Sequence, residues 1–352
     1  MANVEVVTVR LAQGVGFQLA IDPAADDPVT AEVRGGHFAL PTSVETLLAG
    51  VPLGATVIDL GANIGTFAIT AAAFGYNVLA VEASPHNAEL LRESARLNGY
   101  KNLRVVAAAV TDHIGTGHFR ENGPFGVLGR TDSELPGYVA VAATTVDELV
   151  RTELSGAKVG FVKMDIEGSE VAAVRGMARL LGGGPFEKPT RWRRLSHALL
   201  GMAGLLGRES PPVYYESNGH TLNMFRETPS TLLSALRELG YTSYEATSKR
   251  LVSLGEGHVQ FQCVVDYLAV KRGLTGAWLD ARLDEVTVPK QIMLALAEAR
   301  LSANSHRAHA ARTLALASPE ILADSRVQFA LLALKADPVA DVSEAMGWFT
   351  AP

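Results

Sequence analysis

The residues best suited to chemistry begin with a glycine turn at 57–67, VIDLGANIGTF. Gly61 and Gly65 would let a ligand approach the backbone, and the helix that follows presents free N–H groups at its start. Asp59 stands two residues before the first glycine, and Glu82 ends the next predicted strand about twenty residues downstream. A carboxylate at that point can accept hydrogen bonds from both hydroxyls of a ribose. The Gly-x-x-x-Gly spacing differs from the Gly-x-Gly-x-x-Gly turn of dinucleotide enzymes, which disfavours an NAD-dependent oxidoreductase.

A second group of polar side chains follows two later strands, predicted at 158–166 and 211–217. Ligands of an open α/β sheet bind beyond the carboxyl ends of its strands, so these side chains should converge beside the bound ligand. A carboxylate or a histidine there could take up a proton during group transfer. The candidate catalytic residues are Asp165, Glu167, Glu216 and His220.

Several of these residues also have a purely structural interpretation. Asp59 could be an acid at a helix start, and Glu167 could cap the helix that follows it. Glu170 is expected to do no more than complement the dipole of that helix. Lys163 either points into the sheet as a salt-bridge partner or reaches the site. His220 could be a loop histidine without a fixed partner.

The elements that must position these residues alternate between strand and helix from residue 55 onward. Runs rich in β-branched residues alternate with amphipathic stretches such as 85–98 and 169–181. This alternation predicts an α/β fold with a mostly parallel sheet and helices on both faces. The segments 243–248 and 259–272 have little between them and predict an antiparallel pair at the sheet edge, and 139–146 is expected to be another edge strand.

Several stretches resemble the pattern of the FkbM-type methyltransferase family. They are FVKMDIEGSEVAAVRG at 161–176, GANIGTF at 61–67, Asn98-Gly99, AAAVTD at 107–112 and the acid Glu216 at the end of the fifth strand. The resemblance spans roughly residues 27–272. It implies a Rossmann-like class I methyltransferase sheet with an antiparallel last strand. Members are typically S-adenosylmethionine-dependent O-methyltransferases that act on hydroxyls of sugars, polyketides and other small or lipid-linked metabolites.

A likeness to the S-adenosylmethionine site of Rossmann-like methyltransferases implies the cofactor contacts. The glycine turn would face the methionine part, Glu82 would hold the ribose, and residues near Val110 and Asp112 would border the adenine. The cofactor-binding residues implied in this way are Asp59, Gly61, Ala62, Asn63, Gly65, Thr66, Glu82, Ala83, Val110 and Asp112. Asp165, Glu216 and Asn218 also form an oxygen-rich set that could hold Mg²⁺. The resemblance does not require a metal, so Mg²⁺ is the less favoured alternative.

The expected acceptor is therefore a hydroxyl of a small molecule, and two other functions remain open. A nucleic-acid methyltransferase is disfavoured because the formal net charge is −6, and because residues 165–168 lack the Asn/Asp-Pro-Pro-aromatic turn of enzymes that methylate exocyclic amines. A non-catalytic binding or scaffold module is the other alternative. The intact acids at both groups of strand ends argue against it.

The composition limits the remaining choices. Among 352 residues there are 37 acidic, 31 basic and one cysteine, which excludes an internal disulfide and a cysteine-rich zinc site. The expected division is N-terminal strands and turns at 1–50, a methyltransferase domain at 51–273 and a helical extension at 274–352. A basic insertion at about 183–212 could pack on the domain, cover the substrate or touch a membrane surface, and the extension could join copies of the chain into a homo-oligomer. Without a signal peptide or an apolar stretch long enough for a membrane span, a cytoplasmic protein is expected.

Overall fold

The computed structural model describes part of the chain, in two units that are treated separately. The described residues are 4–11, 15–36, 48, 51, 54–123, 125–129, 137–155, 157–182, 210–246, 251–254, 260 and 264–271. One compact unit spans residues 53–272, and residues 1–52 belong to the other. The predicted helical extension at 274–352, and the predicted basic insertion except for its last residues 210–212, lie outside the described residues.

The described part of the N-terminal unit is a hairpin and a helix. Strand β1 (Glu5–Arg10) pairs antiparallel with β2 (Gly16–Ile21), and α1 (Pro28–Arg34) follows. Asp27 caps α1 by accepting a hydrogen bond from the Thr30 N–H, and proline at the first helical position needs no donor there. The strands expected before residue 50 are therefore present in these residues, whereas helix α1 was not predicted.

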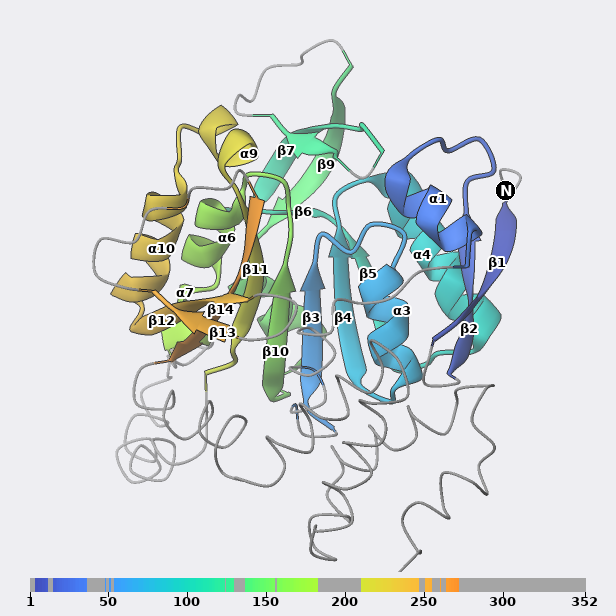
Figure 1. The fold of residues 1–352 in the computed structure, drawn as a ribbon, viewed down its shortest axis with the longest axis horizontal. Coiled ribbons are helices and arrows are strands. Elements are labelled where there is room, and N and C mark those ends of the chain that lie inside the picture. Colours follow the sequence, from blue (N-terminus) through green and yellow to red (C-terminus); the bar gives the residue numbers. More distant parts are fainter. Residues whose placement is uncertain are drawn as a thin grey trace, which may run out of the picture. The chain divides into compact units, whose positions relative to one another are not determined.

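The larger unit is built around an eight-stranded, mostly parallel sheet (Figure 1). Its strand order is β13 (Leu251–Ser253), β12 (Tyr241–Ala246), β14 (Val264–Lys271), β11 (Val213–Asn218), β10 (Val159–Met164), β3 (Thr56–Leu60), β4 (Asn77–Glu82) and β5 (Leu103–Ala107). The five strands from β11 to β5 are parallel, and β14 is antiparallel to both of its neighbours. The predicted mostly parallel sheet with an antiparallel last strand is confirmed.

The two final segments were expected to form an antiparallel pair at the edge, and β12 and β14 do pair antiparallel at that end of the sheet. Within the pair β14 is the inner strand, between β11 and β12. Its apolar residues explain this position, because Tyr267, Leu268 and Ala269 are completely buried. A strand whose two faces are both buried is more stable when both of its edges are paired than when one edge is exposed.

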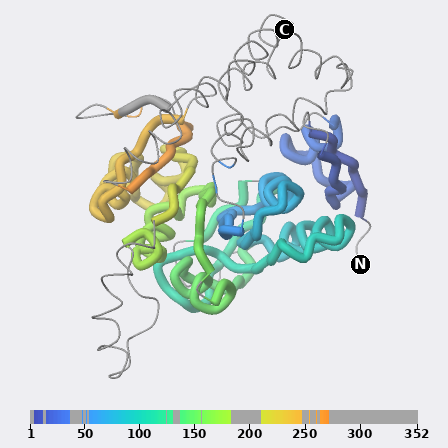
Figure 2. The backbone as a smooth tube through the Cα atoms, turned by 90° about the horizontal axis from the view of Figure 1, so that it is seen from below, coloured from blue at the N-terminus to red at the C-terminus, as the bar shows by residue number. Residues whose placement is uncertain are grey.

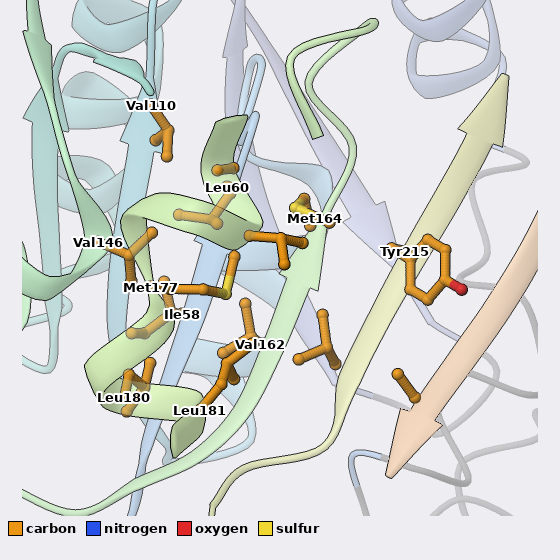
Figure 3. Packing of buried hydrophobic residues seen from close by; sticks show 14 of the residues in the cluster. Ile58, Leu60, Val110, Val146, Val162, Met164, Met177, Leu180, Leu181 and Tyr215 are labelled. Atoms are coloured by element: carbon orange, nitrogen blue, oxygen red, sulfur yellow. The ribbon is translucent and has the colours of Figure 1, made fainter. Parts of the chain in front are cut away.

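Helices cover both faces of the sheet. The helices are α3 (Thr66–Ala73), α4 (Pro85–Asn98), α5 (Val146–Glu153), α6 (Glu170–Gly176), α7 (Ala178–Gly182), α9 (Gly219–Met224) and α10 (Pro229–Glu238). On one face, Ile58 and Leu60 pack with Met177 and the residues of α5, α6, α7 and α10 (Figure 3). On the other face lies α3, whose Phe67 stacks on Phe161 of β10. Figures 1 and 2 place α4 and α10 towards opposite ends of the sheet.

The single helix predicted at 169–181 is divided at Met177 into α6 and α7. The reason lies at Gly176, where a side chain would come within 2.1 Å of the Thr111 backbone oxygen. The close passage of another loop therefore requires glycine at the last residue of α6, and the helical pattern alone does not contain that information.

A second, small sheet lies beside the first, in the order β6 (Ala109–Val110), β9 (Val139–Thr144), β7 (Gly115–Arg120) and β8 (Val127–Leu128). The segment 139–146 was expected to be an edge strand of the main sheet, but β9 belongs to this small sheet and pairs with β6. Buried Ala109, Phe119 and Val141 form its own apolar cluster. None of the helices in the described residues combines the length and the apolar composition of a transmembrane span.

Candidate active site

The glycine turn between β3 and α3 contains three left-handed residues. Gly61, Asn63 and Gly65 have φ angles of 75°, 51° and 95°. A side chain at Gly61 would lie 1.8 Å from the backbone oxygen of Asp165, and one at Gly65 would lie 2.1 Å from Leu91. The two glycines therefore let neighbouring parts of this chain pack against the turn, whereas the sequence suggested only the approach of a ligand.

Glu82 ends β4 directly beside this turn. Its side chain is held at both oxygens, because Oε2 accepts from the Asn63 N–H at 2.7 Å and Oε1 accepts from the Ser84 N–H at 2.8 Å. Glu82 is only 6% exposed. Burial raises its pKa, and the two backbone hydrogen bonds partly oppose that rise. The carboxylate is thus fixed in orientation while each oxygen keeps capacity to accept a further hydrogen bond.

Lys163 connects the turn to the next strand end. It lies in register with Asp59 on the neighbouring strand, and its Nζ is 3.4 Å from Asp59 Oδ1 and 3.5 Å from Asp165 Oδ2. The same Nζ donates to the Gly61 backbone oxygen at 3.1 Å. Burial lowers the pKa of Lys163, but the two carboxylates together raise it well above its usual range. Both sequence interpretations of Lys163 are therefore correct, since it is a salt-bridge partner and it reaches the site.

Asp59 is the buried member of this ion pair. Its side chain has no solvent exposure, and neither carboxylate oxygen has a well-formed hydrogen bond among the described residues, although the Ala68 N–H lies near enough to help lower its pKa. At 3.4 Å the contact with Lys163 is an ion pair without a well-formed hydrogen bond. Burial raises the pKa of Asp59, and Lys163 lowers it in part. Asp59 is therefore more than an acid at a helix start, because Lys163 of β10 balances its charge.

Three carboxylates meet beyond the ends of β10 and β11, and we call Asp165, Glu167 and Glu216 the carboxylate cluster. One carboxylate oxygen from each lies within 4.8 Å of the others, and all three side chains are partly buried. Glu167 has a φ of 54°, a left-handed conformation that is costly outside glycine and concentrates at functional sites. Asp266 of β14 lies directly opposite Glu216 in the strand register. The structure confirms that the two predicted strand ends converge.

Crowding of negative charge changes how these groups ionise. Burial, followed by the nearby Asp165 charge, raises the pKa of Glu167 to about 7 and that of Glu216 to about 8. Burial also raises the pKa of Asp266, against a hydrogen bond from Tyr214 that lowers it. Around neutral pH the carboxylate cluster can therefore take up a proton, which ordinary surface carboxylates cannot do.

Glu170 supports the loop that carries two members of the cluster. Its Oε1 accepts from the Gly168 N–H at 3.0 Å and from the Ile166 N–H at 3.3 Å. The residue is 2% exposed, and burial raises its pKa to about 7 despite these hydrogen bonds. The expectation that Glu170 only complements the helix dipole is wrong, because its side chain turns back and closes the loop.

A comparison with known families identifies the kind of protein to which this site belongs. A family model described as the methyltransferase FkbM domain matches residues 59–243, more than half of the 352-residue chain. The chain belongs to the FkbM methyltransferase family. The matched range begins at Asp59 and includes the glycine turn, Glu82 and the whole carboxylate cluster. The resemblance found in the sequence is confirmed.

Solved structures of other methyltransferases are similar to this FkbM protein at low identity. The precorrin-6y C5,15-methyltransferase of Geobacter metallireducens is 13% identical, with 65% of this chain and 86% of that chain covered and a TM-score of 0.33. The TehB-like SAM-dependent methyltransferase of Corynebacterium glutamicum is 11% identical, with 69% and 95% covered and a TM-score of 0.37. No curated protein matches the sequence significantly. Similarity at this level says nothing about the substrate of this chain.

The FkbM chain gathers most of the predicted cofactor residues at one place. Those in or next to the turn and the end of β4 are Asp59, Gly61, Ala62, Asn63, Gly65, Thr66, Glu82 and Ala83. Val110 is buried in β6. Ala108, which directly precedes β6, donates its N–H to the Glu82 backbone oxygen. Asp112 is exposed, and its Oδ1 lies 2.9 Å from His113 Nδ1. Contact of these residues with a cofactor stays a prediction.

Two residues predicted after β11 have other surroundings. Asn218 caps α9, because its Oδ1 accepts from the His220 N–H at 3.1 Å and the Thr221 N–H at 3.4 Å. This use of the oxygen makes Asn218 a poor member of the predicted Mg²⁺ set. His220 is exposed in the first turn of α9. Its catalytic role stays a prediction.

Sequence reasoning missed four residues around the site, namely Ser84, Asn87, Glu121 and Asp266. Glu121 Oε1 accepts from the Ser84 hydroxyl at 2.7 Å, and Asn87 Nδ2 donates to Asn63 Oδ1 at 3.0 Å. Glu121 falls in a polar, glycine-rich stretch that offered no signal. Asp266 did offer one, since it is a single acid inside the apolar run VVDYLAV.

Proposed function

We propose that this FkbM methyltransferase transfers a methyl group from S-adenosylmethionine to a hydroxyl group of a small, sugar or lipid-linked metabolite. The observation that carries the proposal is the close packing of the Asp165 backbone on Gly61. It joins the glycine turn to the carboxylate cluster, so a cofactor on the turn and an acceptor at the cluster would be neighbours.

The residues present fit such a cofactor. Glu82 has two oriented oxygens that suit the two hydroxyls of a ribose. The turn of Gly61 to Gly65 precedes the N-terminus of α3, where free N–H groups favour a negatively charged group such as a carboxylate. S-adenosylmethionine supplies an electrophilic methyl group on a sulfonium sulfur. The chain must therefore bind it, place the acceptor in line and exclude competing water.

The carboxylate cluster is suited to receive the acceptor's proton. A bound S-adenosylmethionine would supply the methyl group to the hydroxyl oxygen, with its sulfur as the leaving group that keeps the electron pair. The O–H proton must leave at the same time, and Glu167 and Glu216 have pKa values of about 7 and 8 that suit a base at neutral pH. Lys163 links Asp165 to the turn, with its Nζ 3.5 Å from Asp165 Oδ2. The same negative charge disfavours a nucleic acid as acceptor, because phosphates would be repelled.

Two measurements test the proposal in sequence. Calorimetric titration of the full chain with S-adenosylmethionine should give saturable heat, and the absence of binding would refute the cofactor assignment. Transfer of a labelled methyl group is then measured across hydroxyl-bearing metabolites for the wild type, Glu216→Gln and the control Glu148→Gln. Glu148 is a partly exposed acid of α5 that pairs with Arg151 and is not a member of the carboxylate cluster, so its loss removes one negative charge without changing the cluster. We expect loss of transfer only in Glu216→Gln, and equal rates in both variants would show that the cluster does not act.

A further inference from the structure

Glu82 belongs to a closed ring of hydrogen bonds that joins the glycine turn to the start of α4. Its Oε2 accepts from the Asn63 N–H at 2.7 Å, and its Oε1 accepts from the Ser84 N–H at 2.8 Å. Asn87 completes the ring, because its Nδ2 donates to Asn63 Oδ1 at 3.0 Å and its backbone N–H donates to Ser84 Oγ at 3.2 Å. Asn87 is therefore linked to each oxygen of Glu82 through one intermediate residue.

The arm of the ring that passes through Asn63 depends on an unusual backbone conformation. Asn63 has a φ of 51°, in the left-handed region that residues other than glycine adopt at a cost in free energy. Such a conformation persists where the surrounding structure fixes it. The hydrogen bond from Asn87 holds the Asn63 side chain, and the Asn63 backbone in turn directs its N–H at Glu82. The direction of this N–H therefore depends on a side chain of α4.

We propose that Asn87 is a positioning residue for the cofactor, because its side-chain amide fixes Asn63 and thereby aims Glu82 at the ribose hydroxyls. The inference rests on the proposed function in one respect, namely that Glu82 is the ribose-binding acid. The two arms of the ring differ in what they require of Asn87. The arm through Asn63 uses the side chain, whereas the arm through Ser84 uses the backbone N–H. Alanine at this position therefore removes the first arm and retains the second.

The first measurement needs no cofactor. Hydrogen exchange of the Asn63 and Ser84 N–H groups is followed by nuclear magnetic resonance in the full chain, isotope-labelled at the nitrogens of asparagine and serine. In Asn87→Ala we expect the Asn63 N–H to exchange roughly tenfold faster and the Ser84 N–H to keep its rate. A merely structural role of Asn87 would accelerate both. The control is Asn98→Ala, which removes the hydrogen bond from Asn98 Nδ2 to the Ser94 backbone oxygen at the other end of α4 and should change neither rate.

The second measurement is the affinity for S-adenosylmethionine, by calorimetric titration. Asn87→Ala should raise the dissociation constant roughly tenfold, and Asn98→Ala should leave it unchanged. The same substitution is then made in an Asn63→Gly background, since glycine adopts the left-handed conformation without help. There the Asn87 side chain has no asparagine to hold, so Asn63→Gly and Asn63→Gly/Asn87→Ala should bind the cofactor equally. A general destabilisation by Asn87→Ala would weaken binding to the same extent in both backgrounds.

Folding of the variants is checked by circular dichroism. Asn87→Asp, which keeps the size of the side chain but offers no donor when ionised, takes the place of Asn87→Ala if that variant does not fold. Two results would overturn the inference, namely an unchanged exchange rate of the Asn63 N–H in Asn87→Ala, or equal losses of affinity in the two backgrounds. A wild type that does not bind S-adenosylmethionine would instead refute the proposed function, and the exchange rates would still decide whether Asn87 fixes Asn63.

Discussion

Lys163 and Asp59 lie in register on neighbouring parallel strands, with 3.4 Å between Nζ and Oδ1. Asp59 has no solvent exposure, so its charge depends on this lysine. The same ammonium reaches Asp165 and the backbone of Gly61. One side chain thus balances a buried acid and joins the glycine turn to the loop that follows β10.

Replacing Lys163 by methionine should destabilise the fold by about 3–5 kcal/mol, because it leaves a buried carboxylate without its counter-charge. The free energy of unfolding in urea measures this. Since an unpaired Asp59 would take up a proton, the loss should be smaller at pH 5 than at pH 8. The variant Asp59→Asn/Lys163→Met removes both charges and should recover much of the stability. A Lys163→Met variant as stable as the wild type would mean that the ion pair contributes nothing to the free energy of unfolding.

Gly61 provides a prediction with a matched control. Alanine at Gly61 would meet the Asp165 backbone oxygen at 1.8 Å, whereas alanine at Gly75 has no atom within 4 Å. Both glycines have positive φ, 75° and 88°, so both substitutions cost about 1–2 kcal/mol in backbone conformation. Gly61→Ala should cost clearly more in a denaturant melt, and it should also weaken cofactor binding. Equal losses in the two variants would show that the loop after β10 does not pack on the turn.

Stability should fall as pH rises from about 4.5 to about 8 in the metal-free protein. Glu216 has a pKa of about 8 in the folded protein, raised from an ordinary value of 4.5. Between these values the unfolded chain has lost the proton and the folded protein retains it, so each rise in pH favours unfolding. Melting temperatures in a chelating buffer across this range measure the slope. Glu216→Gln should flatten it, while Glu148→Gln should not, and an unchanged slope in Glu216→Gln would assign the effect to other groups.

The parallel strands and the glycine turn could be predicted because their signals are local. Runs of β-branched residues, and the spacing of Asp59, Gly61 and Glu82, determine the strand–turn–helix unit within a short stretch of sequence. The convergence of Asp165 and Glu216 followed from a general rule about strand ends in open sheets. The carboxylate cluster was therefore largely foreseeable, including Glu167.

The remaining features depend on tertiary contacts. The place of β14 between β11 and β12 depends on where a strand with two buried faces is most stable. The hydrophobic pattern of β14 is equally consistent with an edge hairpin. The passage of Thr111 leaves no room for a side chain at Gly176, the last residue of α6. The loop-closing role of Glu170 depends on backbone N–H groups that only the folded loop presents. None of these can be read from residue spacing alone.

Glu82 should decide cofactor affinity. Its two oxygens are oriented by the Asn63 and Ser84 N–H groups, so the side chain is arranged before a ligand arrives. Glu82→Ala removes charged hydrogen-bond acceptors worth about 1.5–3 kcal/mol each, which predicts a loss of S-adenosylmethionine affinity of roughly tenfold or more. Glu89→Ala on α4 is the control, because Glu89 is an exposed acid that pairs with Arg92 on the helix surface. Calorimetric titration gives both dissociation constants. Circular dichroism checks that Glu82→Ala folds, and unchanged affinity in that folded variant would exclude Glu82 as the ribose-binding residue.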